Sequence, residues 1–301
     1  MLNKKNYILF IVLIALLAVS WLYIFPYQKK EPALNNFLAQ VDISNLNKIL
    51  VTQNDTIITI NKSNGVWTVE PDNWPMEQTL ADALVETLTN LTTLKFEEVS
   101  LKPEKKKTFQ TDESGLQITL YEDNAEVANF VIGKIASDYQ STYLSKNDID
   151  STYQIKETLV RAFDIENWKD KTIFSLNVEK IKSITFKYPT YEFAITNEPD
   201  SKGELYWRVV DPLTRLNKDK TEEMKDTLIN LEASNIPEQN LQKLGKNNLI
   251  ITIKTEDTED SLVIGDLQNN EYFVKKQSTG RIFLISKTDR NSLFKQIKDL
   301  K

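Results

Sequence analysis

Apolar and polar positions alternate with a period of two in several short stretches of the chain, which is the pattern of half-buried β-strands. Residues 49–51 and 58–60 alternate in this way on either side of a polar turn. The pair Asn64-Gly65, which is typical of tight hairpin turns, then precedes a strand that contains Trp67. This part of the chain is therefore predicted to form a three-stranded antiparallel meander.

A second set of the same signals follows later in the chain. Residues 184–186 and 191–195 alternate as a further predicted hairpin. After each set, apolar residues recur with the 3.6-residue period of an α-helix that buries one face. This stripe consists of Leu80, Leu84, Leu88 and Leu91 in the first predicted helix and of Met224, Leu228 and Leu231 in the second.

Four short strands are predicted after each helix. They cover roughly residues 116–121, 126–132, 141–145 and 152–155 in the first set, and 249–254, 261–265, 271–276 and 281–285 in the second. Each set is then predicted to end in a helical segment. Runs of strands on both sides of a single helix, without strict alternation of strand and helix, predict a mainly antiparallel α+β fold.

The two sets are related by an internal duplication. The matched segments are residues 67–69 with 207–209, 87–91 with 227–231, 131–133 with 263–265, 143–144 with 273–274 and 153–155 with 283–285. The first two matches share an offset of 140 residues, and the third has an offset of 132, so the second copy has a shorter intervening loop. Loops tolerate such a change at little cost. A unit of this length predicts a duplicated domain rather than a solenoid repeat.

These patterns divide the chain into five predicted parts. They are a tail at residues 1–6, a transmembrane anchor at 7–27, a polar linker at 28–40, a first α+β domain at 41–168 and a second α+β domain at 169–301. The anchor is predicted because the positions from Tyr7 to Phe25 are all uncharged. Such a helix crosses most of a hydrocarbon layer of about 30 Å, and the lipid bilayer is therefore the expected partner of this segment.

A signal peptide that is removed after export is the alternative for this segment, since Ala18-Val19-Ser20 resembles a cleavage site. The apolar run continues from Trp21 to Phe25 without the polar break of a processed signal, which favours an uncleaved single-pass anchor. Two lysines lie on each side of the segment, so the positive-inside rule does not decide the topology.

The composition excludes several kinds of chemistry. The 301 residues include no cysteine and no histidine. Thiol nucleophiles, disulfides, the usual zinc ligand sets and every imidazole-based triad are therefore ruled out, and we predict no catalytic, cofactor-binding or metal-binding residues. Residues 31–301 carry 33 basic and 43 acidic side chains, a net charge of −10. This charge disfavours nucleic acid and anionic lipid headgroups as partners.

The order of the segments resembles a bacterial family of membrane-anchored proteins known as domain of unknown function 4340. The resemblance rests on the anchor, on the strand at residues 65–69 that leads through Pro71 into the leucine-striped helix, on residues 131–133, and on the segment from Trp168 to Phe174. It implies an extracytoplasmic region at the cell (inner) membrane and an accessory role beside transporter components of the ATP-binding-cassette (ABC) type that serve gliding or polysaccharide export. It implies no catalytic residues.

Two motifs are candidate binding sites for a ligand or a partner. Lys105, Lys106 and Lys107 belong to the one basic cluster of the sequence, which could contact headgroups or an acidic polymer, although a solvated loop turned by a proline is favoured. Tyr188 and Tyr191 could present two rings to a sugar or to a partner protein, although a purely structural role in a hairpin turn is favoured.

Two further groups of residues have both a functional and a structural interpretation. Trp67 and Trp207 could stack against ligands, but their apolar strands favour burial in the core. Glycoside hydrolysis needs two acids on opposite sides of the scissile bond. The carboxylates to consider are Glu97, Glu98, Asp148 and Asp150, although chance groupings are expected among 43 acidic residues.

We therefore expect a non-enzymatic, single-pass membrane protein whose two domains act as an interaction module or scaffold. The expected partner is a membrane protein such as a transporter permease. One alternative is a module that binds glycan or peptide in the cleft between the domains, and another is a carboxylate-dependent glycan hydrolase. Exposed aromatic rings in a cleft favour the first alternative, and convergent acids with shifted pKa values favour the second.

Overall fold

The computed structural model describes residues 36–301, apart from residues 55, 160–161, 164–167, 200, 204, 211–212, 238–243 and 246–247. The predicted tail and anchor, residues 1–6 and 7–27, lie outside the described residues, as does most of the linker. In the part of the chain that is described, no helix combines the length and the apolar character needed to cross a membrane. The chain divides into two compact units, the first ending at Trp168 and the second beginning at Lys169.

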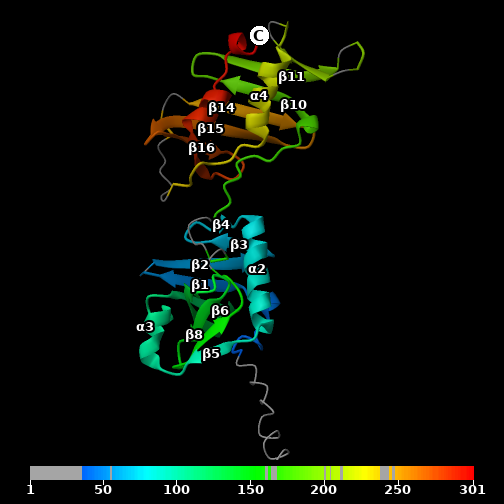
Figure 1. The fold of residues 1–301 in the computed structure, drawn as a ribbon. Coiled ribbons are helices and arrows are strands. Elements are labelled where there is room, and N and C mark those ends of the chain that lie inside the picture. Colours follow the sequence, from blue (N-terminus) through cyan, green and yellow to red (C-terminus); the bar gives the residue numbers. More distant parts are fainter. Residues whose placement is uncertain are drawn as a thin grey trace, which may run out of the picture. The chain divides into compact units, whose positions relative to one another are not determined.

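The first domain contains one antiparallel sheet, which has nine strands within the described residues (Figure 1). The strands are β1 (Lys48–Gln53), β2 (Thr56–Ser63), β3 (Val66–Val69), β4 (Trp74–Pro75), β5 (Glu97–Ser100), β6 (Leu116–Glu122), β7 (Ala125–Ile135), β8 (Thr142–Lys146) and β9 (Thr152–Ile155). Their order across the sheet is β4-β3-β2-β1-β6-β7-β8-β9-β5. The predicted meander is confirmed, and Asn64 and Gly65 turn between β2 and β3 with φ of 50° and 83°.

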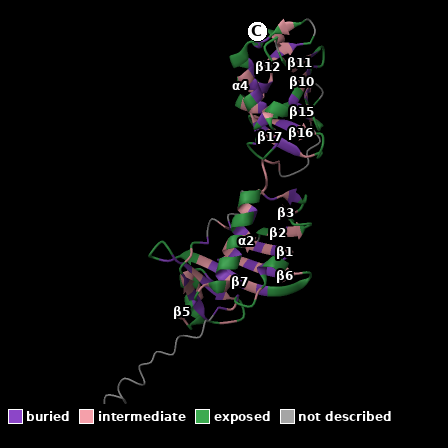
Figure 2. Ribbon diagram, turned by 90° about the vertical axis from the view of Figure 1, so that its right-hand side faces the viewer, coloured by how far each residue is buried: buried purple, intermediate pink, exposed green. Residues whose placement is uncertain are grey.

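Helix α2 (Gln78–Thr93) buries the predicted leucine stripe of the first domain. Leu84, Leu88 and Leu91 are almost completely buried and share one hydrophobic core with apolar side chains of β1, β2 and β6. The opposite face of the helix is exposed (Figure 2). The other helical segments are the 3-10 helices η2 (Ile43–Asn45) and η3 (Pro103–Lys105) and the single-turn helix α3 (Lys106–Phe109).

The second domain repeats this architecture. Its strands are β10 (Ile181–Lys187), β11 (Glu192–Pro199), β12 (Leu205–Val209), β13 (Thr214–Arg215), β14 (Leu249–Thr255), β15 (Glu259–Gln268), β16 (Glu271–Lys276) and β17 (Ile282–Ser286). Within the described residues their order is β13-β12-β11-β10-β14-β15-β16-β17, again antiparallel throughout. The helices are η4 (Val178–Lys180), α4 (Lys218–Ile229), α5 (Lys287–Leu293) and η5 (Ile297–Asp299).

The two sheets have the same topology. Strands β1 to β4 correspond to β10 to β13, α2 corresponds to α4, and β6 to β9 correspond to β14 to β17. Strand β5 lies beside β9, and in the second domain the equivalent place beside β17 is held by a single bridge between Asn235 and Leu284. The prediction of two tandem, mainly antiparallel α+β domains is therefore confirmed.

The sequence pattern did not predict the shortest elements. Strands β4 and β13 have two residues each, and β5 has four residues that are mostly exposed. Alternation is not visible in such short or solvated segments. The helical ending predicted for the second domain is present as α5, whereas the corresponding part of the first domain falls partly outside the described residues.

The start of α2 makes the stability of the first domain dependent on pH. Glu77 is the N-cap residue, and its carboxylate accepts hydrogen bonds from the backbone N–H groups of Thr79 and Leu80 at 3.1 and 2.9 Å. The side-chain hydroxyl of Thr79 also donates to this carboxylate, and this bond, followed by the two backbone bonds, lowers the pKa of Glu77 below its ordinary value. A carboxyl group with a lowered pKa stabilises the fold while it is ionised, and it loses this effect as the pH falls through the pKa of the folded state.

We expect the variant Glu77→Asn to keep the cap and to lose this pH dependence. Asparagine is among the best N-cap residues, and Asn217 already caps α4 at the equivalent position. Thermal melting of the wild type and the variant between about pH 7 and about pH 3 measures the effect. The melting temperature of the first domain should fall more steeply in the wild type below the ordinary glutamate pKa of 4.5. Parallel curves for the two proteins contradict this prediction.

Candidate functional site

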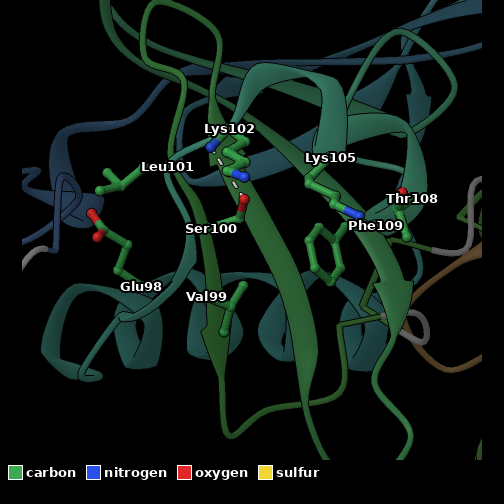
Figure 3. A pocket seen from close by; sticks show the side chains of 8 residues that line it. All are labelled: Glu98, Val99, Ser100, Leu101, Lys102, Lys105, Thr108 and Phe109. Carbon is green, nitrogen blue, oxygen red and sulfur yellow. Dashed lines mark hydrogen bonds between the residues drawn. The ribbon is translucent and has the colours of Figure 1, made fainter.

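A groove of about 520 Å³ opens between the edge strand β5 and the helical segment η3–α3 of the first domain. We call it the β5–α3 groove. Its lining residues, shown in Figure 3, are Glu98, Val99, Ser100, Leu101, Lys102, Lys105, Thr108 and Phe109. All eight come from one short stretch of sequence, so that strand, turn and helix form the site as a unit.

Strand β5 is held in place by the buried residue that precedes it and by one neighbouring strand. Phe96, which precedes it, is buried, and its ring lies edge-on to that of Phe37 with the centroids 5.1 Å apart. Glu98 pairs with Tyr153 of β9, and the register then shifts before Ser100, so Val99 lies at a β-bulge. In the described part of the sheet β5 has no neighbour on its other side. The outer edge of a terminal strand carries unpaired backbone donors and acceptors.

Helix α3 is fixed at its C-terminal end. Gln110 adopts the left-handed conformation with φ of 56°, and its N–H caps the carbonyls of Lys106 and Lys107. The hydroxyl of Ser145 on β8 donates to the carbonyl of Thr111 at 2.8 Å. Phe109 packs on the ring of Tyr143 with the centroids 4.5 Å apart. These contacts turn the helix toward the sheet and leave the ring of Phe109 at the floor of the groove.

Gly133 allows this close approach. It lies where the register of β7 against β8 shifts, and a Cβ atom there would overlap the carbonyl oxygen of Phe109 and lie 2.6 Å from Cγ2 of Thr111. Gly265 has the same role in the second domain, where a Cβ atom would lie 2.8 Å from Cα of Leu244, beside an equivalent shift of β15. The matched glycines of the duplication are therefore explained by a loop that crosses directly over a bulged strand.

The groove combines exposed apolar side chains with cations. Leu101 is 66% exposed and Val99 38% exposed, which is unusual for large apolar residues next to each other on one edge. Lys102 and Lys105 lie on one side of these residues, and Glu98 lies at the opposite end of the strand (Figure 3). Such a surface can bind an extended chain through its backbone, its apolar side chains and its charges.

The predicted basic cluster lies at this groove, but its conformation was predicted wrongly. Lys105 lines the groove, and Lys106 donates from Nζ to the carbonyl of Lys146 at 3.4 Å. Lys107 is exposed on α3. The cluster was expected to be a solvated loop, whereas it forms η3 and α3, because proline suits the first turn of a helix as well as a loop.

The aromatic hairpin turn is also present, but only one of its rings is accessible. The rings of Tyr188 and Tyr191 stack with centroids 4.4 Å apart, and Tyr188 N–H donates to the carbonyl of Tyr191 at 2.8 Å. Tyr188 is buried under Phe294, and its hydroxyl donates to the carbonyl of Lys295. Burial raises the pKa of both tyrosines. Tyr188 therefore fixes the hairpin to the C-terminal segment and cannot present its ring to a ligand, whereas Tyr191 is 39% exposed.

The two tryptophans and two of the carboxylates that the sequence singled out are buried or have partners within the fold. Trp67 and Trp207 are buried, as predicted. Glu98 accepts a hydrogen bond from Ser151 at 3.3 Å, and Asp148 pairs with Lys146 at 2.8 Å. The bond from Lys146 lowers the pKa of Asp148, which is the opposite of what a proton donor in glycoside hydrolysis needs.

A second, smaller cavity of about 260 Å³ lies beside β12 and β13 in the second domain. It contains Tyr206, Arg208 and Arg215, with the guanidinium of Arg215 4.9 Å above the ring of Tyr206. Arg208 forms an ion pair with Glu198, and the bond to this carboxylate raises the pKa of Arg208. The paired charge makes this cavity a weaker candidate than the β5–α3 groove.

Sequence reasoning missed Val99 and Leu101 as site residues. The only signal for them is the alternation of Val99, Ser100 and Leu101 directly before the basic cluster, and three residues are too few to identify a strand. Their exposure depends on β5 being at the edge of the sheet, which is a property of the tertiary structure.

Comparison with known proteins supports the duplication and identifies the family. The family model described as "Domain of unknown function (DUF4340)" matches residues 67–218 and, again, residues 207–301. The two matches begin at Trp67 and Trp207, the two tryptophans that the internal duplication pairs. No curated protein and no solved structure matches the chain. With most of its length covered by two copies of one family model, the chain belongs to the family of domain of unknown function 4340.

Proposed function

We propose that this chain is a membrane-anchored, non-enzymatic binding protein that recruits a partner protein through its first domain. The observation that carries the proposal is the β5–α3 groove, where exposed apolar side chains lie beside the edge of a sheet. Exposed apolar patches with a polar rim are typical of protein interaction sites. A folded domain suits a scaffold, because a binding surface that is already ordered loses little entropy when a partner docks.

The location that we propose rests on the sequence. The uncharged segment from Tyr7 to Phe25 is long enough for a single-pass anchor. The family resemblance supports domains on the extracytoplasmic side of the cell membrane and work beside an ABC-type transporter or an envelope or gliding assembly. The proposed partner is therefore a membrane protein such as a transporter permease.

Capture of the full chain from detergent-solubilised membranes of its own host, followed by mass spectrometry, tests this function. We expect the tagged chain to resist extraction by alkaline carbonate and to co-purify with an integral membrane protein. The matched control is the double variant Ile14→Arg with Leu17→Arg. Each central charge costs about 2.5–3.5 kcal/mol of insertion free energy, so this variant should lose both the membrane and the partner.

Two results contradict the proposal. The first is a wild-type chain that remains in the soluble fraction. The second is a wild-type chain that captures no membrane protein in excess of the control variant.

A further inference from the structure

We propose that the β5–α3 groove binds an extended acidic segment of a partner protein, which adds to the first sheet as a strand beside β5. This inference rests on the proposed function and names the surface and the chemistry through which the partner binds. It follows from three properties of the groove, namely its free strand edge, its apolar floor and its local charge.

The free edge of β5 supplies backbone donors and acceptors. Among the described residues β5 pairs only with β9, and it is the last strand of a sheet in which every neighbouring pair is antiparallel. Addition of a strand to such an edge is a general mode of peptide recognition, in which main-chain hydrogen bonds supply affinity and pockets for alternate side chains supply specificity. The antiparallel neighbours make an antiparallel partner the expected orientation.

The apolar floor supplies a place for the partner's side chains. Val99 on β5 and Leu101 directly after it are exposed, and the ring of Phe109 on α3 lines the same groove across from Val99 (Figure 3). Phe109 is supported from behind by Tyr143, so the floor is rigid before the partner binds. Apolar side chains of an added strand would cover these residues and remove them from water.

The local charge selects an acidic partner. Residues 36–168 carry 21 acidic and 11 basic side chains, and four of these 11 cations are Lys102, Lys105, Lys106 and Lys107. A basic cluster on a domain with a net charge of −10 attracts acidic groups to this place and to few others on the domain. Because Glu98 lies at the other end of β5, the acids of an antiparallel partner belong in its N-terminal half, opposite Lys102 and Lys105.

The same observations disfavour two other occupants. A second copy of the chain, paired through β5 about a two-fold axis, would bring a second domain with a net charge of −10 against the first, so that the two domains would repel each other. An anionic lipid surface would attract the lysines, but lipid headgroups have no polypeptide backbone to pair with a strand edge. Their negative charge would also repel Glu98, which lines the same groove. A protein segment with both apolar and acidic side chains can pair with the strand edge, cover the apolar floor and bind the lysines.

The chain that follows the predicted anchor packs beside the residues that precede β5. Asn36 donates from Nδ2 to the carbonyls of Leu91 and Leu94 at 2.7 and 2.9 Å, and Phe37 contacts Phe96, directly before β5. Eight residues, 28–35, separate Asn36 from the end of the predicted anchor at residue 27. They span at most about 30 Å when fully extended, so the groove stays within reach of a juxtamembrane segment of a partner.

Binding of a defined peptide to the full chain in phosphatidylcholine nanodiscs tests the inference. The probe is a fluorescein-labelled peptide of about eight residues, the length of an ordinary strand, in which two glutamates precede alternating valine and threonine. Fluorescence anisotropy measures its dissociation constant, and hydrogen exchange measures protection of the backbone amides of β5. We expect saturable binding and slower exchange in β5. The same peptide with lysines in place of the glutamates, or with N-methylated backbone amides, should not bind.

Substitutions on the exposed surface separate this site from the rest of the domain. Leu101→Asp should weaken binding of the probe at least about tenfold, because it places a charge on the apolar floor. Lys105→Glu should weaken binding by about three- to tenfold through charge reversal. The matched control is Ile57→Asp, because Ile57 on β2 is 65% exposed and lies far from β5 in the order of the strands. This control should change the affinity less than about twofold.

Each of four results overturns the inference. They are no binding of the probe by the wild type, equal binding by the wild type and Leu101→Asp, protection of β5 by phosphatidylglycerol nanodiscs without peptide, and protection of β5 that depends only on the concentration of the chain itself. Failure of the proposed function is a different result. If Leu101→Asp still captures the membrane partner of the wild type, the scaffold function stands and only the groove is excluded as the site.

Discussion

Replacement of Trp67 by alanine is expected to destabilise the first domain by about 3–5 kcal/mol and to leave the second domain unchanged. Trp67 lies on β3 and is only 6% exposed, within a core whose members all come from the first domain. Its carbonyl accepts the N–H of Met76 at 2.9 Å, so the residue also holds the chain that leads into α2. Alanine removes the large buried ring and leaves a cavity that the sheet cannot close.

The duplication supplies the matched experiment. Trp207 is 8% exposed, and its carbonyl accepts the N–H of Leu216 at 3.1 Å, which is the same arrangement at an offset of 140 residues. Trp207→Ala should therefore destabilise the second domain alone. Differential scanning calorimetry of the full chain should show two transitions, of which one moves by more than about 10 °C in each variant.

A surface variant provides the control for both. Val66 precedes Trp67 on β3 and is 53% exposed, so Val66→Ala should change stability by less than about 0.5 kcal/mol. If Trp67→Ala lowers both transitions equally, the two domains do not unfold independently and the prediction fails.

Replacement of Gly133 by alanine is expected to destabilise the first domain by about 1–3 kcal/mol and to displace α3. The added methyl group would overlap the backbone of Phe109, and a backbone atom cannot move away without moving its helix. Because Phe109 forms the floor of the β5–α3 groove, the groove should change shape in this variant. Gly265→Ala should have the corresponding effect on the second domain, where the methyl group would meet the backbone of Leu244.

Calorimetry together with hydrogen exchange measures this effect. Gly133→Ala should lower the transition of the first domain and speed the exchange of amides in residues 103–111. Val127→Ala, at an exposed position of the same strand, is the control and should alter neither quantity. Unchanged exchange in residues 103–111 would show that the loop does not depend on the close approach at Gly133.

Much of the candidate site could not be predicted from the sequence. The lysines were visible, but strand β5 was not, because a strand at the edge of a sheet is exposed on more than one side and loses the alternation that identifies strands. The burial of Tyr188 could not be predicted for a related reason. Its local sequence is that of an exposed turn, and the residues that bury it, Phe294 and Lys295, follow more than a hundred positions later.

The sequence by itself determined the fold class, most of the strands, the buried faces of the two long helices and the duplication, because each of these depends on a local period or on a repeat. The tertiary structure alone decided which strand ends the sheet, which side chains stay exposed beside it and which glycines let a loop cross a bulge. These features depend on contacts between segments that are distant in sequence, and no local pattern records them. The free edge of β5 is the clearest example, since a strand becomes an edge only when no other segment pairs with it.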